Sequence, residues 1–446
     1  MEIKQFYDDN LAHASYAILS KGEIAIIDPA RDPRPYLDYA KNNNGKIIAV
    51  IETHPHADFV SSHLELHKKT GADIYVGKLV GVEYPHKAVD EGDEIKIGDI
   101  KIEVVNTPGH SPDSITLLIK DENGQDYAIA SGDTLFVGDV GRPDLRESAG
   151  NINQKREELA GSMFETVQTK LKKLSDNILV YPAHGAGSLC GKSLSDARFS
   201  TIGAEKKDNY AFQINNKEEF IDALLEDQPF IPAYFGYNVE LNRKGAPDFE
   251  ESIKAVPRIS NESELKKGVP VVDSRSKDKF KAGHVKGAIN IEKSLKFETW
   301  LGSIVKPGEK FYLICDSEND FDMMLGRIAK IGYEVNVEGV LTNPSSGLVK
   351  SKEFDIEDFR KHPEKYNIVD VRNQSETKQG LIFNKAKTIP LHELRKRINE
   401  VPKDKPVVFH CAGGGRGATA ASIAEGELDA DVYDLGAMVK DFASKK

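Results

Sequence analysis

Four short segments combine histidine or aspartate with glycine, proline or serine in a way that suits metal binding. They are Thr53-His54-Pro55-His56-Ala57-Asp58, Pro108-Gly109-His110-Ser111, Ser131-Gly132-Asp133-Thr134 and Pro182-Ala183-His184-Gly185. Imidazole nitrogens and carboxylate oxygens bind divalent metals such as zinc, iron or manganese in open catalytic sites. A lone histidine is more often a core or surface residue, but the agreement of four segments favours a metal site.

A predicted β-strand precedes each of these segments. Short runs rich in Ile, Val and Ala, separated by turn residues, predict strands at 22–27, 46–51, 100–105, 127–130 and 177–181 in a mixed α/β domain. The four segments can therefore converge at one edge of a sheet. His13, His86 and His362 lack this pattern, and we expect them to be ordinary core or surface residues.

A second candidate for chemistry is the loop that follows the predicted strand 407–410. It reads Cys411-Ala412-Gly413-Gly414-Gly415-Arg416, and a helical run follows it at 418–424. The backbone N–H groups of the three glycines, the helix N-terminus and Arg416 would favour a thiolate or persulfide anion, which makes Cys411 a candidate nucleophile. The missing Walker lysine disfavours a phosphate loop, and a tyrosine-phosphatase loop would need one more residue between Cys411 and Arg416.

The C-terminal half of the chain contains a repeat of about 95 residues, which is typical of a duplicated domain. Asp273 matches Asp370 at an offset of 370 − 273 = 97, and Cys315 matches Cys411 at 411 − 315 = 96. Three carboxylates follow Cys315 within five residues and would raise the pKa of its thiol. We therefore expect the first copy to be inert in sulfur transfer and to position the second copy.

Composition limits the remaining possibilities. The 446 residues predict about three domains, and a net charge of -11 without a long basic run disfavours nucleic-acid binding. The longest aliphatic run, near 47–51, is too short to span a membrane, and the acidic N-terminus does not resemble a signal peptide. Three sparse cysteines suggest a reducing cytoplasm, and polar residues with Pro and Gly predict a linker at about 236–258.

The four N-terminal segments together resemble the metallo-β-lactamase fold, an αββα sandwich, over about residues 1–240. The segment 138–145 resembles the persulfide dioxygenase branch of that fold. Dinuclear hydrolases of the fold, such as glyoxalase II, carry histidine directly after the motif aspartate, whereas Phe59 follows Asp58 here and cannot bind a metal. The resemblance therefore implies one Fe(II) per chain.

This resemblance also assigns roles to single residues. Fe(II) would be held by His54, His110 and Asp133, a set that leaves positions open for substrate and O₂. Outer-sphere residues would be His56, Asp58 and His184, although the sequence leaves open whether His56 binds the metal. Arg142 would contact an anionic substrate group or form a surface ion pair, and Cys190 is either an accessory thiol near the iron or a small buried hydrophobic residue.

The C-terminal loop resembles the rhodanese sulfurtransferase family, which predicts two rhodanese-like α/β domains with parallel sheets at 259–345 and 350–446. The whole chain thus looks like a fused persulfide dioxygenase and sulfurtransferase of sulfide detoxification. The resemblance implies that a low-molecular-weight persulfide reacts with O₂ to give sulfite, that Cys411 then makes thiosulfate, and that the protein is a cytoplasmic homo-oligomer. The alternatives are a zinc-dependent thioester hydrolase fused to rhodanese domains and a non-enzymatic sulfur carrier or persulfide sensor.

Overall fold

The protein is described by a computed structural model that covers residues 1–146, 155–294 and 296–443. It divides into two compact units. The N-terminal unit comprises Met1–Ser252 and the short segment Ala329–Gly332, and the C-terminal unit comprises Ile253–Ile328 and Tyr333–Lys446. None of the described helices is both long enough and apolar enough to cross a membrane.

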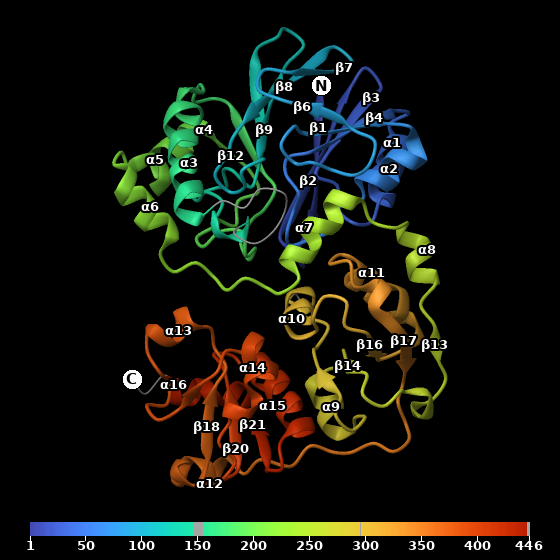
Figure 1. The fold of residues 1–446 in the computed structure, drawn as a ribbon, viewed down its shortest axis with the longest axis vertical. Coiled ribbons are helices and arrows are strands. Elements are labelled where there is room, and N and C mark those ends of the chain that lie inside the picture. Colours follow the sequence, from blue (N-terminus) through green and yellow to red (C-terminus); the bar gives the residue numbers. More distant parts are fainter. Residues whose placement is uncertain (147–154, 295, 444–446) are drawn as a thin grey trace. The chain divides into compact units, whose positions relative to one another are not determined.

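Two six-stranded sheets form the inside of the N-terminal unit, with helices on both outer faces (Figure 1). The first sheet contains β1 (Glu2–Asp8), β2 (His13–Ser20), β3 (Glu23–Ile27), β4 (Lys46–Glu52), β5 (Asp73–Gly77) and β6 (Lys87–Val89), in that order. The second contains, in reverse order, β7 (Glu94–Ile97), β8 (Ile100–Asn106), β9 (Ile115–Lys120), β10 (Asp126–Gly132), β11 (Leu179–Pro182) and β12 (Ser200–Thr201). The covering helices are α1 (Arg34–Asn42) and α2 (His63–Thr70) on the first sheet, and α3 (Arg156–Thr169), α4 (Ile202–Asp208), α5 (Tyr210–Gln213) and α6 (Lys217–Leu225) on the second.

The strands are apolar on both faces because both faces are covered. In β3, Ala25 and Ile27 pack into the core between the two sheets, whereas Ile24 and Ile26 pack against α1. This two-residue alternation is the period of a β-strand. The predicted strands are confirmed, and so is the αββα arrangement that the sequence resemblance implied.

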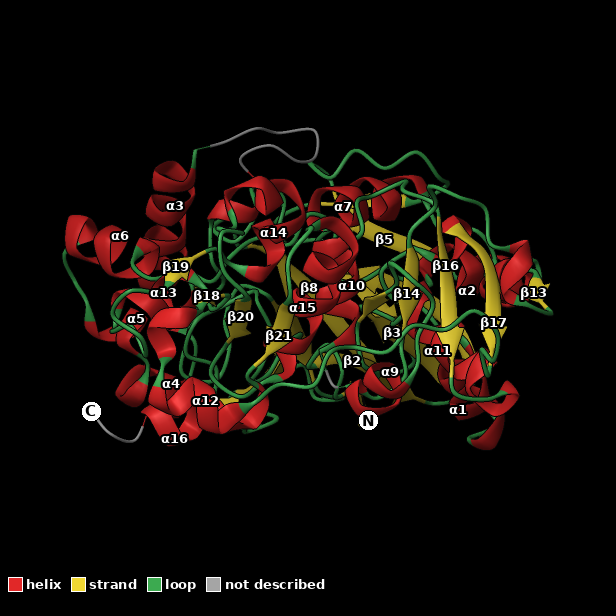
Figure 2. Ribbon diagram, turned by 90° about the horizontal axis from the view of Figure 1, so that it is seen from below, coloured by secondary structure: helices red, strands yellow, loops and turns green. Residues whose placement is uncertain are grey.

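The C-terminal unit contains two copies of a parallel sheet flanked by helices, which confirms the predicted duplication. The first sheet has the order β13 (Arg258–Ile259), β17 (Val337–Thr342), β16 (Phe311–Cys315), β14 (Val271–Asp273) and β15 (Ile289–Asn290). The second has the order β19 (Lys387–Thr388), β18 (Asn367–Asp370), β20 (Val407–His410) and β21 (Val432–Asp434). Figure 2 shows β16 beside β17 in the first copy and β20 beside β21 in the second. The helices are α9 (Lys277–Ala282), α10 (Phe297–Ile304) and α11 (Phe321–Ala329) in the first copy, and α12 (Ile356–Lys361), α13 (Gln374–Lys378), α14 (Leu391–Arg397), α15 (Gly415–Glu427) and α16 (Lys440–Ala443) in the second.

The predicted linker at about 236–258 is wrong over most of its length. Two helices, α7 (Phe235–Lys244) and α8 (Phe249–Lys254), occupy it instead. Buried Asn242 on α7 explains why this polar stretch is ordered. Its Nδ2 donates to the carbonyl oxygens of His56 and Phe59 at 2.8 Å each, and its Oδ1 accepts the N–H of Ser61 at 2.8 Å. Helix α7 thus stabilises the loop from His56 to Ser61, which contains part of the first predicted ligand segment.

We predict that Asn242→Ala destabilises this loop by about 3 kcal/mol, because three buried backbone groups lose their partners. Thermal melting of the full-length protein and hydrogen exchange at Ser61 would measure the effect. Asn238→Ala is the matched control, since Asn238 lies one turn earlier on α7 and neither of its buried amide atoms has a hydrogen-bond partner among the described residues. Equal destabilisation by the two variants would contradict the role of Asn242.

Candidate metal centre and sulfur loop

Three donor atoms from separate strand ends meet in the interior of the N-terminal unit. Asp133 Oδ2 lies 3.7 Å from His54 Nε2 and 3.6 Å from His110 Nε2, and all three residues are buried. Such separations suit three ligands of one metal ion, because each ligand would lie about 2.1 Å from the ion. Neither His54 Nε2 nor Asp133 Oδ2 has a hydrogen-bond partner among the described residues. The structure thus brings together the three predicted ligands.

The tautomer of His54 is fixed by its neighbours. The Thr53 hydroxyl donates to Asp28 Oδ2 at 2.8 Å, so its oxygen must accept the 3.1 Å hydrogen bond from His54 Nδ1. The proton of His54 therefore lies on Nδ1, and Nε2 presents its lone pair to Asp133. Burial, followed by the neighbouring His56, lowers the pKa of His54 well below its usual value, which keeps the ring neutral.

His110 is oriented by the segment that resembles the persulfide dioxygenase branch. Its Nδ1 lies 2.8 Å from the backbone oxygen of Arg142 and must donate, because a carbonyl oxygen only accepts. Nε2 then carries the lone pair of the imidazole. Gly141 allows this approach, since a Cβ atom there would lie 1.9 Å from the Asp133 backbone oxygen and 2.8 Å from His110 Cβ. The segment therefore acts on the site through its backbone.

The third predicted ligand, Asp133, is held by His184. The Nδ1 atom of His184 lies 2.7 Å from Asp133 Oδ1, and its Nε2 lies 2.8 Å from Asp58 Oδ2. Burial disfavours a charge on His184, but the two carboxylates outweigh burial and raise its pKa well above the usual value. Burial alone would also raise the pKa of Asp133, yet His184 and the two other histidines hold it well below its usual value. Asp133 thus keeps one oxygen on His184 and turns the other toward the ligand set.

An apolar ring lies beside this ligand set. Phe59 is 1% exposed, and its ring centroid lies 3.8 Å from that of His13 and 4.4 Å from that of His56. His13 is a buried residue beside the site, and its backbone pairs with that of His184. The sequence analysis expected an ordinary core or surface residue and did not anticipate this contact. Cys190 is also buried beside the site, and its Sγ lies within 4.8 Å of a possible ligand atom of Asp58 and of one of His184. Burial, with Asp58 and Asp133, raises the pKa of the Cys190 thiol well above its usual value.

Two further predicted residues have defined neighbours. His56 Nε2 lies 3.2 Å from Asp28 Oδ1, and His56 can also direct a nitrogen toward Asp133 and His184. The Arg142 guanidinium is 1% exposed and forms two 2.7 Å hydrogen bonds with Asp144. This arrangement is the ion pair named as the alternative, but it is buried rather than on the surface. Substrate binding by Arg142 and the outer-sphere role of His56 stay predictions.

The sulfur loop of the second copy closes on its cysteine. The Gly414 N–H donates to Cys411 Sγ at 3.0 Å, and α15 begins at the next residue. Gly414 has a φ of 101°, and a Cβ atom there would lie 2.6 Å from the backbone carbon of Gly436, so only glycine fits. Around Gly413 and Gly415, a Cβ atom would meet no atom within 4 Å. Arg416 forms hydrogen bonds of 2.5 and 2.8 Å to Glu376 on α13.

The first copy carries the opposite charges at the corresponding positions. The repeat offsets place Asp320 at the position of Arg416 (416 − 96 = 320) and Lys279 at that of Glu376 (376 − 97 = 279). Lys293 pairs with Asp320 at 2.9 Å, and Lys279 pairs with Asp316 at 2.7 Å. The pKa of Cys315 rises to about 12. Burial contributes most to this rise, and Asp320, one of the three carboxylates that follow Cys315, contributes less, as does Asp273.

Comparisons with known proteins agree with this architecture. Residues 8–184 match the model of the metallo-beta-lactamase superfamily, and residues 258–340 and 355–442 match the rhodanese-like domain. A crystal structure of a metallo-beta-lactamase from Staphylococcus aureus subsp. aureus COL is 35% identical and aligns with 77% of this chain and 99% of its own, with a TM-score of 0.70. The chain belongs to the metallo-beta-lactamase superfamily. Two rhodanese-like domains follow the metallo-beta-lactamase domain.

Curated relatives match the metallo-beta-lactamase domain. The probable metallo-hydrolase YqgX of Bacillus subtilis (strain 168) is 31% identical over 191 residues, which are 38% of this chain and 84% of YqgX. The hydroxyacylglutathione hydrolase of Dictyostelium discoideum is 32% identical over 216 residues, which are 47% of this chain and 75% of that enzyme. The names of both relatives describe hydrolases.

We predict that Thr53→Val lowers metal affinity by about 10- to 100-fold, because valine keeps the shape of threonine but cannot fix the tautomer of His54. Competition of the full-length protein with a chromophoric chelator would measure the affinity. Thr53→Ser is the control, since it retains the hydroxyl group that bonds Asp28 and His54. Unchanged metal affinity in Thr53→Val would contradict the proposed orientation.

Proposed function

We propose that the metallo-beta-lactamase domain is a persulfide dioxygenase and that the second rhodanese-like domain is a sulfurtransferase, together converting a low-molecular-weight persulfide into sulfite and thiosulfate. The observation that carries the proposal is the buried set His54, His110 and Asp133, with lone pairs converging from two imidazoles and one carboxylate. Two histidines and one carboxylate with open positions are typical of non-haem Fe(II) oxygenases. One Fe(II) held by these residues would supply sites for the substrate sulfur and O₂.

The surrounding residues support a single metal ion in this domain. Phe59 lies where dinuclear relatives carry a ligand, and its buried ring contributes no donor atom. His184 holds Asp133 through one carboxylate oxygen, so the other oxygen is directed at the ligand set. The overall reaction balances as RSSH, O₂ and H₂O giving RSH, sulfite and two protons. The R group is the same in the persulfide and in the thiol product.

The sulfur transfer is assigned to Cys411. Its thiolate attacks the outer sulfur of a second persulfide, the S–S bond of the donor breaks, and the thiolate RS⁻ leaves. Sulfite then attacks the outer sulfur of the Cys411 persulfide, which releases thiosulfate and restores the Cys411 thiolate. The Gly414 N–H, 3.0 Å from Sγ, stabilises negative charge on the sulfur. The three free cysteines fit a reducing compartment, where we place the protein.

We predict one iron per chain in anaerobically purified protein and O₂ uptake on addition of a persulfide such as glutathione persulfide. Replacing His54, His110 or Asp133 by Ala should remove both the iron and the O₂ uptake, because each variant loses one of three protein ligands. Elemental analysis and an oxygen electrode provide the two measurements. Persistent O₂ uptake in all three variants would refute the ligand assignment.

A second candidate is hydrolysis of a glutathione thioester with zinc, which the similarity to a hydroxyacylglutathione hydrolase favours. Phe59 argues against it, because the second metal ion of dinuclear hydrolases would lack a ligand. Two zinc ions per chain together with turnover of a hydroxyacylglutathione would establish this candidate and exclude the dioxygenase. A protein that binds metal and persulfide but makes no more than one equivalent of product would be a sulfur carrier or sensor.

We predict that Cys411→Ser abolishes sulfur transfer but leaves O₂ uptake close to that of the wild type, because the variant loses only the nucleophile of the rhodanese-like domain. The product should shift from thiosulfate toward free sulfite, which ion chromatography can separate. Cys315→Ser is the matched control and should leave both products unchanged, since its thiol is buried and protonated. An unchanged thiosulfate yield in Cys411→Ser, after correction for the spontaneous reaction of sulfite with persulfide, would remove Cys411 from the pathway.

A further inference from the structure

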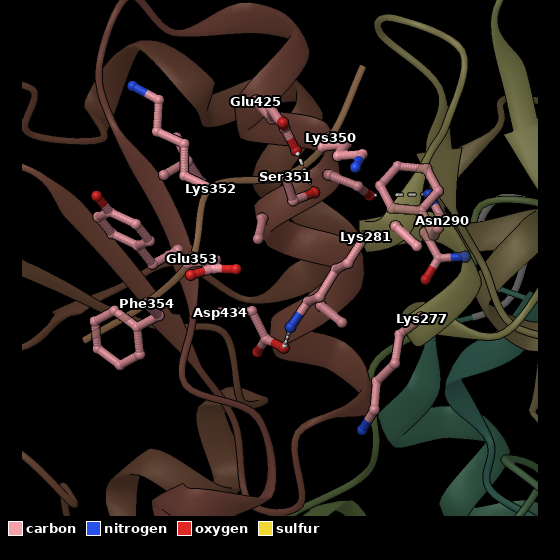
Figure 3. A pocket seen from close by; sticks show the side chains of 17 residues that line it. Lys277, Lys281, Asn290, Lys350, Ser351, Lys352, Glu353, Phe354, Glu425 and Asp434 are labelled. Atoms are coloured by element: carbon pink, nitrogen blue, oxygen red, sulfur yellow. Dashed lines mark hydrogen bonds and ion pairs between the residues drawn. The ribbon is translucent and has the colours of Figure 1, made fainter. Parts of the chain in front are cut away.

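A cavity of about 390 Å³ lies between the two rhodanese-like domains (Figure 3). The first domain lines it with residues of α9, and the second with residues of α15 and β21; the segment 350–354 between the domains also lines it. Helix α15 is the helix that begins at the sulfur loop. The first domain and the helix that follows the Cys411 loop therefore both line this cavity.

Direct contacts hold the first domain against α15. The Asn290 N–H donates to Ser422 Oγ at 2.9 Å. The Ser351 hydroxyl, from the segment between the domains, donates to Glu425 Oε2 at 3.1 Å. At Gly426, an added Cβ atom would lie 3.3 Å from Gly287 Cα, so the two backbones pack closely. This part of α15 cannot shift without disturbing the first domain.

One ion pair inside the cavity joins the two domains. Figure 3 shows Lys281 of α9 pointing to Asp434 at the end of β21, and Nζ lies 3.1 Å from Oδ2. The Asp434 side chain is 1% exposed, whereas that of Lys281 is 43% exposed. A buried carboxylate is costly to keep ionised without a cation, and Lys281 is the cation that pairs with Asp434 among the described residues.

Asp434 in turn contacts the base of the sulfur loop. Its Oδ1 accepts the Gly436 N–H at 2.9 Å, and the Gly436 turn packs against Gly414 so closely that a Cβ atom on Gly414 would collide. A Cβ atom on Gly417, in the first turn of α15, would lie 2.7 Å from Asp434 Oδ1. Gly414 is the residue whose N–H bonds Cys411 Sγ. Continuous contacts thus lead from Lys281 to the sulfur.

We propose that Lys281 of the first rhodanese-like domain is a positioning residue for sulfur transfer at Cys411, acting through Asp434 and the Gly436 turn. The proposal rests on the sulfur transfer proposed above. Through this contact, the first rhodanese-like domain contributes to sulfur transfer in the second. With the carboxylate paired, Asp434 and the Gly436 turn hold Gly414 where its N–H meets the sulfur. Without the ammonium group, Asp434 loses its ion-pair partner, and the Gly436 turn that it holds loses this support.

The test compares Lys281→Met with Lys281→Arg and with Lys277→Met. Lys277 is the matched control because it lies one turn earlier on α9 and lines the same cavity, while no ion pair joins it to another described residue. Two quantities are measured in the full-length protein. The first is the steady-state kcat and KM for sulfur transfer from thiosulfate to a thiol. The second is the rate at which iodoacetamide alkylates Cys411, with Cys411→Ser as the blank for the other two cysteines.

Lys281→Met should lower both kcat and the alkylation rate by about tenfold with little change in KM, because a displaced loop loses orientation rather than affinity. Lys281→Arg should restore most of both rates, and Lys277→Met should match the wild type. O₂ uptake on a persulfide should be equal in all variants, which would show that the metallo-beta-lactamase domain is intact. Wild-type kcat and alkylation rate in Lys281→Met, or an equal loss in Lys277→Met, would overturn the proposal.

The alkylation rate separates this proposal from the proposed function. If the wild type transfers no sulfur although Cys411 is alkylated, the assigned sulfurtransferase activity fails. The comparison of alkylation rates between Lys281→Met and Lys277→Met still decides whether Lys281 positions the loop. If the wild type transfers sulfur and the two variants do not differ from it, only the role of Lys281 fails.

Discussion

The ring of His184 joins Asp58 and Asp133 with contacts of 2.8 and 2.7 Å, and the geometry of the metal site depends on this bridge. Both carboxylates are buried, and a buried carboxylate needs a cation or a hydrogen-bond donor close to it. The His184 imidazole lies close to both carboxylates, so a single side chain meets this need. The bridge also determines which oxygen of Asp133 remains for a metal ion. The ligand set is therefore a consequence of the network around it.

Three elements far apart in the sequence hold this network in place. The start of β2 pairs with His184 through the backbone of His13. Asp28 receives both the N–H and the hydroxyl of Thr53, which fixes the end of β4 and the ring of His54. Gly132 permits β10 to end directly beside Thr53, because a Cβ atom there would lie 2.4 Å from Thr53 Oγ1. The ends of β4 and β10, which precede the predicted ligands His54 and Asp133, thus lie side by side.

Sequence reasoning found the candidate metal-binding segments because they follow strands, and a strand is a local pattern of two-residue period. It located Asp133 and His110 and named Phe59 as the residue that departs from dinuclear relatives. It missed His13, Asp28 and Asn242 because their roles arise only from long-range contacts. Nothing in the local sequence of 236–258 indicates that Asn242 will form a hydrogen bond with Ser61, which is 181 residues away. A polar segment without clear periodicity is typical of a linker. The duplication in the C-terminal unit was predictable from the repeat, and its parallel sheets from the resemblance to the rhodanese family. The contact of Lys281 with Asp434 was not predictable.

The surroundings of the three cysteines differ in how well they suit the proposed sulfur transfer. Cys190 and Cys315 are buried next to carboxylates, and both have pKa values raised by burial first and by these charges second. A protonated thiol is a poor nucleophile, so neither is suited to take a sulfane sulfur from a persulfide. Cys411 is also buried, but it receives a backbone N–H from a glycine that no other residue could replace. The first rhodanese-like domain has lost the glycines and reversed the charges of its loop, while its α9 still supplies Lys281 to the loop of the second domain. The role proposed for Lys281 would let the first domain contribute through contact with that loop rather than through a reaction at Cys315.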